Sequence, residues 1–225
     1  IRQESSRHTQ LISEFVKKKY NKNYLKFSEN EKIDFLKSKI NSSKNHINKF
    51  QFRNKENKEV WDTFNVLSQE PSECLGAYVI SMTSSASDIL SVSFLQKEAK
   101  IKNKLRVVPL FETLDDLINA KSIMMNLFSF KWYRKLIQNK QEVMIGYSDS
   151  SKDAGKICAS WYQYNAQEEI VKWATTNNIE DVLFQERGDS AGRVWGPIHT
   201  TLRTLPTTPV NRKLRIPDQG DATQY

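Results

Sequence analysis

Short apolar runs that are followed at once by polar residues recur along the chain and predict its strands. Five such runs stand inside the sequence: AYVISM at 77–82, LRVVPLF at 105–111, EVMIGY at 142–147, DVLF at 181–184 and LRI at 214–216. Each is followed within two residues by Ser, Thr, Asp, Glu or Gln, and the residues before Glu4 have the character of one more strand end. The pattern therefore predicts six strands that end in polar residues.

Stretches in which apolar residues recur at helical spacing lie between these runs. Their apolar positions are Leu11, Ile12, Phe15 and Val16, then Leu114, Leu117, Ile118, Met124, Met125 and Phe128, and then Ala154, Ile157, Trp161, Tyr164 and Ile170. Alternation of strands and helices predicts parallel strands, and polar residues after each strand are typical of barrel active sites. We therefore expect a helix-rich α/β fold, an incomplete (β/α)8 TIM-type barrel. An open doubly wound sheet is the alternative, with its ligands at the same strand ends.

The domain organisation that we expect is a single partial domain over residues 1–225, which is a piece of a longer protein. The sequence begins at Ile1 without a Met and stops at Tyr225 soon after a strand-like run. Residues 39–58 are rich in Asn, Lys and Ser and have few apolar residues, so we expect a solvent loop between two helices there.

Charge and composition exclude some function classes. The net charge is +8, but Lys is spread along the chain and often stands beside Asn, which favours a solvated basic surface over a nucleic-acid groove. There is no apolar run of 18 residues, so no membrane span is predicted. Cys74 and Cys158 are far apart and lack metal-ligand spacing. An intracellular, cytoplasmic chain with reduced thiols is the interpretation that we adopt.

Two carboxylates stand where a metal site is expected. Glu112 and Asp149 each follow a predicted strand, and the two strands are neighbours in the sequence. Two hard oxygen ligands at adjacent strand ends suit Mg²⁺ or Mn²⁺. The alternative is that each carboxylate only caps the helix that follows it. In the run VMIGYSDSSKDAG at 143–155, Ser150 or Ser151 can cap the next helix, which leaves Lys152 in its anion-attracting first turn.

Four cations stand at or just beyond strand ends, namely Arg2, Lys152, Arg187 and Arg193. Each alone is compatible with a surface charge, but together with two carboxylates they predict a site for a small, multiply charged anion held on a divalent cation. The three histidines show no ligand spacing, so we expect His8, His46 and His199 to be structural or exposed. We expect the tryptophans of the amphipathic helices, Trp132, Trp161 and Trp173, to lie in the core.

Five segments follow one another along the chain: IRQESSRH at 1–8, GAYVISM at 76–82, RVVPLFETLDDL at 106–117, WYRKLIQNKQEVMIGYSDSSKDAG at 132–155 and ASWYQYNAQEE at 159–169. In this order they resemble phosphoenolpyruvate carboxylases. The GYSDS-x-KD-x-G element is highly specific, and the resemblance covers essentially all 225 residues. It implies the central barrel portion of an enzyme about four times as long.

The resemblance implies a carboxylating lyase of the cytoplasm, a homotetramer that binds neither nucleic acid nor membranes. Its reaction converts phosphoenolpyruvate and bicarbonate to oxaloacetate and phosphate by way of carboxyphosphate and the enolate of pyruvate. By position, the metal ligands for Mg²⁺ or Mn²⁺ are Glu112 and Asp149. The phosphate and the transferring group are held by Arg2 and Arg187, Lys152 is the lysine of the signature, and Arg193 is the second arginine of the glycine-rich loop.

The chain departs from the family in that loop. The family pattern is close to FHGRGG-x-x-GRGG, whereas residues 184–196 read FQERGDSAGRVWG. Gln185 stands in place of a histidine and cannot carry a proton at neutral pH. Four glycines are replaced by Glu186, Asp189, Val194 and Trp195, although glycine there permits close backbone approach to an anion. A catalytic histidine of a TAHPT-type motif is also absent from these 225 residues.

Three hypotheses follow. The first is a fragment of a carboxylating lyase, inactive by itself. The second is a degenerate paralogue that keeps the fold and carboxylates poorly, with leakage to pyruvate and phosphate. The third is nucleic-acid binding by the basic surface, which requires tight, salt-dependent binding to DNA or RNA.

Overall fold

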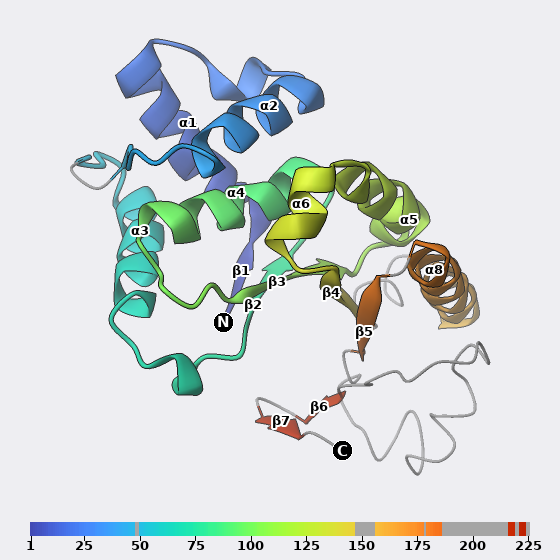
Figure 1. The fold of residues 1–225 in the computed structure, drawn as a ribbon. Coiled ribbons are helices and arrows are strands. Elements are labelled where there is room, and N and C mark those ends of the chain that lie inside the picture. Colours follow the sequence, from blue (N-terminus) through green and yellow to red (C-terminus); the bar gives the residue numbers. More distant parts are fainter. Residues whose placement is uncertain (48–49, 147–155, 178, 186–215, 219–220, 224–225) are drawn as a thin grey trace. The chain divides into compact units, whose positions relative to one another are not determined.

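The computed structural model describes residues 1–47, 50–146, 156–177, 179–185, 216–218 and 221–223 (Figure 1). The chain divides into two compact units, residues 1–107 and 108–225. Each unit is described by itself below.

The first unit surrounds a parallel strand pair with helices. In chain order it contains β1 (Arg2–Glu4), α1 (Ser5–Tyr20), the 3-10 turn η1 (Tyr24–Lys26), α2 (Glu29–Ile40), α3 (Lys55–Leu67), the 3-10 turn η2 (Ser72–Cys74), β2 (Ala77–Ser81) and α4 (Ala86–Glu98). β1 and β2 pair in parallel, with Gln3 opposite Ile80. The core contains Leu11 and Phe15 of α1, Phe64 of α3 and Phe94 of α4, all fully buried.

Three helices of this unit, α2, α3 and α4, begin directly after residues that cap them. Ser28 and Glu31 form a capping box at the start of α2, and the side chain of Asn54 accepts a hydrogen bond from the backbone N–H of Glu56 at the start of α3. Ser85 and Asp88 form a second capping box at the start of α4. Such caps satisfy backbone N–H groups that have no partner within the helix. They explain why the helices begin where the sequence places Ser or Asn.

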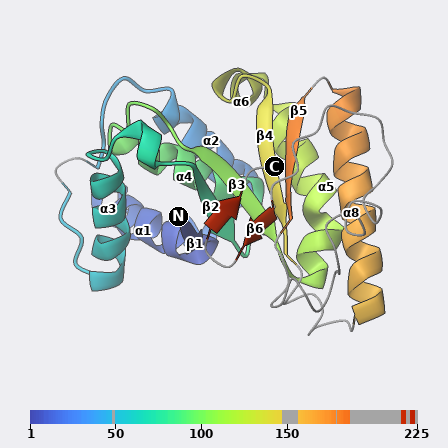
Figure 2. The ribbon, with the colours of Figure 1, turned by 90° about the horizontal axis from the view of Figure 1, so that it is seen from below.

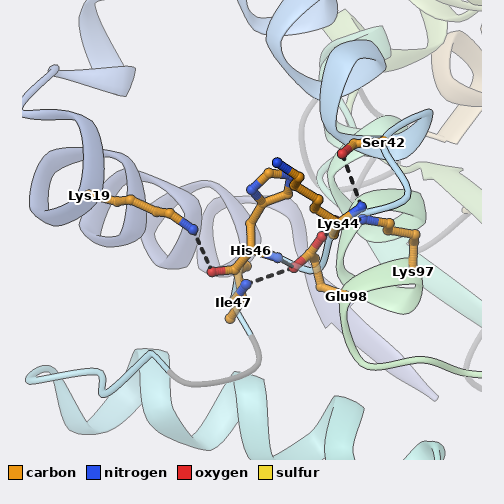
Figure 3. A network of polar contacts seen from close by, with 7 residues as sticks. All are labelled: Lys19, Ser42, Lys44, His46, Ile47, Lys97 and Glu98. Atoms are coloured by element: carbon orange, nitrogen blue, oxygen red, sulfur yellow. Dashed lines mark hydrogen bonds and ion pairs between the residues drawn. The ribbon is translucent and has the colours of Figure 1, made fainter.

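The connection between α2 and α3, residues 41–54, is fixed by a buried carboxylate (Figure 3). Glu98, at the end of α4, is fully buried, and its Oε2 accepts hydrogen bonds from the backbone N–H groups of His46 and Ile47. Lys97 Nζ lies 2.8 Å from the other carboxylate oxygen, and Lys19 Nζ donates to the carbonyl of His46 at 2.9 Å. The connection is thus shorter than the loop expected over 39–58, and Ile47 is buried in it.

The second unit contains three parallel strands in sequence order. β3 (Arg106–Phe111) begins at the end of the first unit and is followed by α5 (Leu114–Ser129), α6 (Lys131–Leu136), β4 (Lys140–Ile145), α8 (Lys156–Thr176) and β5 (Glu180–Gln185). β3 pairs with β4, and β4 with β5. Figures 1 and 2 show α5 and α8 side by side, and an ion pair of 3.1 Å joins Lys121 to Glu169 across them.

The predicted helix-rich α/β class is confirmed. The predicted parallel pairing is confirmed for β1 with β2, β3 with β4, and β4 with β5. The parallel pairing expected for the sixth run, 214–216, is wrong. Ile216 begins β6 (Ile216–Asp218), which pairs antiparallel with β7 (Asp221–Thr223), while Leu214 and Arg215 lie outside the described residues. Only two residues of the sequence separate β6 from β7, and so short a link permits antiparallel pairing only.

The long helix predicted around 154–170 is confirmed as α8, but the expectation that Trp161 is a core residue is wrong. Its side chain is 62% exposed, beside the 89% exposed Ile157 one turn earlier. The buried face of α8 instead carries smaller residues, among them Ala159, Ala166 and Val171. Among the described residues, none of the helices is long and apolar enough to cross a bilayer.

Candidate functional site

The three parallel strands of the second unit end in line with one another. Phe111 of β3 lies opposite Ile145 of β4, and Ile145 lies opposite Gln185 of β5. The backbone N–H of Gly146 donates to the carbonyl of Phe111 at 2.9 Å. The residues that follow these strands therefore leave the sheet at the same edge, where ligands of parallel α/β sheets bind. Glu112 is the first residue beyond β3 at this edge.

Glu112 is a buried carboxylate that the helix cap does not require. Glu112 is only 3% exposed, and buried charges are normally paired or bound to metals. The helix that follows, α5, is capped by Thr113 and Asp116: Thr113 Oγ1 accepts from the Asp116 N–H at 3.2 Å, and Asp116 accepts from the Thr113 N–H at 3.1 Å. Capping of α5 is therefore accounted for by these two residues.

The other predicted residues of the second unit, Asp149, Lys152, Arg187 and Arg193, lie outside the described residues, as does His199. The segment that carries Asp149 and Lys152 leaves β4 directly after Gly146, which stands at the same strand edge as Glu112. The structure thus describes one carboxylate of the predicted pair and the strand end from which the other departs.

Arg2 lies on β1 in the first unit, and its side chain is exposed. The strand alternates between exposed and half-buried positions, so Arg2 and Glu4 lie on one face and Gln3 on the other. Ser5 Oγ, at the start of α1, donates to the carbonyl of Met82 at 2.7 Å, which joins the end of β1 to the end of β2.

A polar cluster of His8, Tyr78 and Gln3, which the sequence did not reveal, connects α1, β2 and β1. His8 Nε2 is 2.8 Å from the hydroxyl of Tyr78, and that hydroxyl donates to Gln3 Oε1 at 2.6 Å. His8 and Tyr78 are fully buried. Burial, aided by the positive charge of Arg7, lowers the pKa of His8 to about 3, so the ring is neutral at physiological pH. His8 was expected to be structural or exposed, and its burial and hydrogen bond show that it is structural. His46, in the 41–54 connection, is part-buried.

The donor chemistry of the β3 strand end fits a hard divalent cation. A carboxylate oxygen is the ligand type that Mg²⁺ and Mn²⁺ prefer, and these ions keep several positions for water and substrate. Within the part of the chain that the structure describes, no group of three or more His, Cys, Asp or Glu side chains gathers in metal-binding geometry. Glu112 is thus the single described contributor to the predicted pair.

The chain is similar throughout to one family of enzymes. The family model described as phosphoenolpyruvate carboxylase matches residues 1–225. Identities are 44% over 224 residues to phosphoenolpyruvate carboxylase of Flaveria pringlei, 43% over 225 residues to phosphoenolpyruvate carboxylase 3 of Arabidopsis thaliana, and 44% over 225 residues to phosphoenolpyruvate carboxylase of Edwardsiella ictaluri. These matches cover all of this chain but 23% of each plant protein and 26% of the bacterial one, so the chain spans about a quarter of their length. The chain belongs to the phosphoenolpyruvate carboxylase family.

Proposed function

We propose that this chain supplies the metal- and phosphate-binding portion of an enzyme that carboxylates phosphoenolpyruvate. The overall reaction joins phosphoenolpyruvate and bicarbonate to give oxaloacetate and phosphate. The observation that carries the proposal is the family match over the whole chain, at 40–44% identity to the enzymes compared. The buried Glu112 at the end of β3, which the α5 cap does not use, supports it.

In this proposal Glu112 and Asp149 hold the divalent cation. Bound Mg²⁺ or Mn²⁺ supplies Lewis-acid chemistry, which polarises substrate oxygens and offsets negative charge. Arg2 and Arg187 bind the phosphate and the transferring group, because a guanidinium contacts such oxygens through two parallel N–H groups. Lys152 and Arg193 add positive charge, which stabilises the negative charge of carboxyphosphate and of the pyruvate enolate.

The parallel strands β1 to β4, each of which a described helix follows, are the strand–helix units of a partial (β/α)8 barrel in this proposal. The carboxyl ends of such strands carry the active site, which agrees with Glu112 standing directly after β3. We propose further that the complete enzyme is a cytoplasmic homotetramer, as the family resemblance implies.

A direct test measures both products of the polypeptide that carries these 225 residues. Oxaloacetate is followed with malate dehydrogenase, and pyruvate with lactate dehydrogenase, with and without bicarbonate. Oxaloacetate formation that requires bicarbonate and Mg²⁺ or Mn²⁺ supports the proposal. No consumption of phosphoenolpyruvate by a folded polypeptide of the relatives' length contradicts it.

The sequence of the 184–196 loop favours a second candidate, a degenerate paralogue with leaky chemistry. Glu186 and Asp189 add negative charge where an anionic intermediate is expected, and Val194 and Trp195 replace glycine positions of the family pattern. We therefore expect hydrolysis to pyruvate and phosphate to exceed carboxylation. Restoring the four glycines, together with Gln185→His, should shift the product ratio back toward oxaloacetate. An unchanged ratio after restoration contradicts this candidate.

A further inference from the structure

The polar cluster behind β1 forms a chain of hydrogen bonds from α1 through β2 to β1. It runs from His8 on α1 to Tyr78 on β2 and on to Gln3 on β1. Aromatic rings surround it: Phe64 stacks on Tyr78 with ring centres 5.2 Å apart, and the His8 ring meets Phe64 edge-on at 6.2 Å. Hydrogen bonds in such an apolar setting are stronger and more directional than hydrogen bonds in water.

The donors of this chain can be assigned from the atom that has no partner. His8 Nδ1 is buried and makes no hydrogen bond. An orphaned N–H is rarer in folded proteins than an orphaned acceptor, so the ring proton is placed on Nε2. His8 Nε2–H then donates to the Tyr78 oxygen, and the Tyr78 O–H donates to Gln3 Oε1. The low pKa of His8 keeps this arrangement intact at physiological pH.

Gln3 follows Arg2 directly on β1, so a hydrogen bond that fixes the Gln3 side chain also sets the direction of the Arg2 side chain. β1 is a strand of three residues, so few ladder bonds fix its rotation about its own axis. Gln3 and Tyr78 lie on the same face of the β1–β2 pair, because Gln3 is opposite Ile80 and Tyr78 is two residues before Ile80. When Gln3 is held on this face, Arg2 must project from the other.

We infer that His8 and Tyr78 are positioning residues for Arg2, which they orient through Gln3 toward the anion that Arg2 binds. The inference rests on the proposed function for the identity of that anion, the phosphate group of phosphoenolpyruvate. The burial of His8 and Tyr78, beside the half-buried Gln3, has a desolvation cost that apolar residues of similar size would avoid. The hydrogen bonds of these side chains fix which face of β1 Gln3 occupies. Such fixing matters because displacement of a positioning group by about 1 Å can cost about 100-fold in rate.

Three substitutions separate positioning from simple packing. Tyr78→Phe removes the hydroxyl and keeps the ring that stacks on Phe64. His8→Gln can place an amide N–H where Nε2 stood, whereas His8→Asn places its amide nearer the former Nδ1. The first readout is the NMR resonance of the Arg2 Nε–H group in the 225-residue chain, identified by its loss in Arg2→Lys. Arg134 is the internal control, because its Nε–H donates to the Phe128 carbonyl at 2.6 Å in the other unit.

The second readout is the affinity of the same chains for phosphoenolpyruvate in the presence of Mn²⁺, by calorimetry. Tyr78→Phe and His8→Asn should shift or broaden the Arg2 resonance, leave that of Arg134 in place, and weaken phosphoenolpyruvate binding about tenfold. His8→Gln should keep both readouts near wild type. Mn²⁺ affinity should change less than about twofold in all three, since Glu112 is untouched.

An unchanged Arg2 resonance in Tyr78→Phe overturns the inference, as does equal behaviour of His8→Gln and His8→Asn. A uniform disturbance of Arg2 and Arg134 also overturns it, because that result indicates general unfolding. Failure of the proposed function has another signature. In that case the Arg2 resonance responds as expected, but phosphoenolpyruvate binding is absent or is insensitive to Arg2→Gln.

Discussion

Acidic residues follow both β2 and β3, but only β3 is followed by a buried acid, Glu112, in addition to the acid that caps the next helix. After β2, Asp88 accepts hydrogen bonds from the N–H groups of Ser84 and Ser85 and completes the cap of α4. After β3, Asp116 does the same for α5, and the strand end carries a further carboxylate, Glu112. Glu98, at the other end of α4, is likewise explained by its backbone donors. Among the described residues, Glu112 is therefore a buried carboxylate that the caps of α4 and α5 do not use.

A candidate metal ligand can be separated from a structural acid by its position relative to the residue that caps the helix. A capping acid stands three residues after a Ser or Thr, as Asp88 follows Ser85 and Asp116 follows Thr113. Glu112 has no such relation, since it precedes the capping residue. Substitutions of Glu112, Glu98, Asp88 and Asp116 test this division between acids that stabilise the fold and the acid that we assign to the metal.

The largest effect is expected for Glu112→Gln, which replaces one carboxylate oxygen with an amide nitrogen. Changes in groups that only support metal ligands weaken metal binding 10–100-fold, so loss of a ligand should weaken Mn²⁺ binding by about 100-fold or more. Asp116→Asn is the matched control, and equal Mn²⁺ affinity of these two variants would contradict the division.

Glu98→Ala should cost stability and leave Mn²⁺ affinity unchanged. It removes the acceptor of two backbone N–H groups, those of His46 and Ile47, inside a buried site. Buried donors left without partners cost about 1–3 kcal/mol, so chemical denaturation should show a loss of about 2 kcal/mol. Glu98→Gln, which keeps one acceptor oxygen, should lose less. If the two variants are equally stable, the backbone contacts are not the source of the effect.

The pH dependence of stability should carry a contribution from His8. Its pKa in the folded chain is about 3, below the unfolded value of 6.5, so the unfolded chain binds the proton first as pH falls. Stability from this residue is complete above pH 6.5 and declines by at most about 1.4 kcal/mol per pH unit as pH falls from 6.5 toward 3. Denaturation at several pH values in wild type and His8→Gln should show a shallower decline in the variant.

The smallest effect is expected for the two helix caps. Asp88→Ala and Asp116→Ala each remove a cap, and each should lower the free energy of unfolding by about 1 kcal/mol. Mn²⁺ affinity should be equal to wild type in both. A loss of Mn²⁺ binding in Asp116→Ala but not in Asp88→Ala would move the metal assignment from Glu112 to Asp116.

Much of this arrangement was readable from the sequence. The runs at 77–82 and 105–111 predicted β2 and β3, and Glu112 was recognisable because it follows an apolar run directly. The sequence did not show which apolar residues of a helix are exposed. The helical spacing within α8 predicted a core position for Trp161, but its side chain is 62% exposed. Periodicity identifies a helix better than it identifies which apolar side chains find neighbours.

The His8 cluster could not have been predicted from spacing. Its members, Gln3, His8 and Tyr78, are brought together by pairing of β1 with β2 across more than 70 residues. The same limit applies to Glu98 and its contacts at 46–47, which join the end of α4 to a connection that reads as a polar loop. Long-range hydrogen bonds of this kind depend on tertiary structure and leave no local pattern.

The most direct test of the account is a Mn²⁺ titration, followed by electron paramagnetic resonance, of wild type, Glu112→Gln, Asp149→Asn and the double variant. The account predicts one site in wild type, a loss of about 100-fold in each single variant, and a double variant whose loss is not the sum of the two, because both side chains bind the same ion. Wild-type affinity in either single variant, or strictly additive losses, would contradict the shared site.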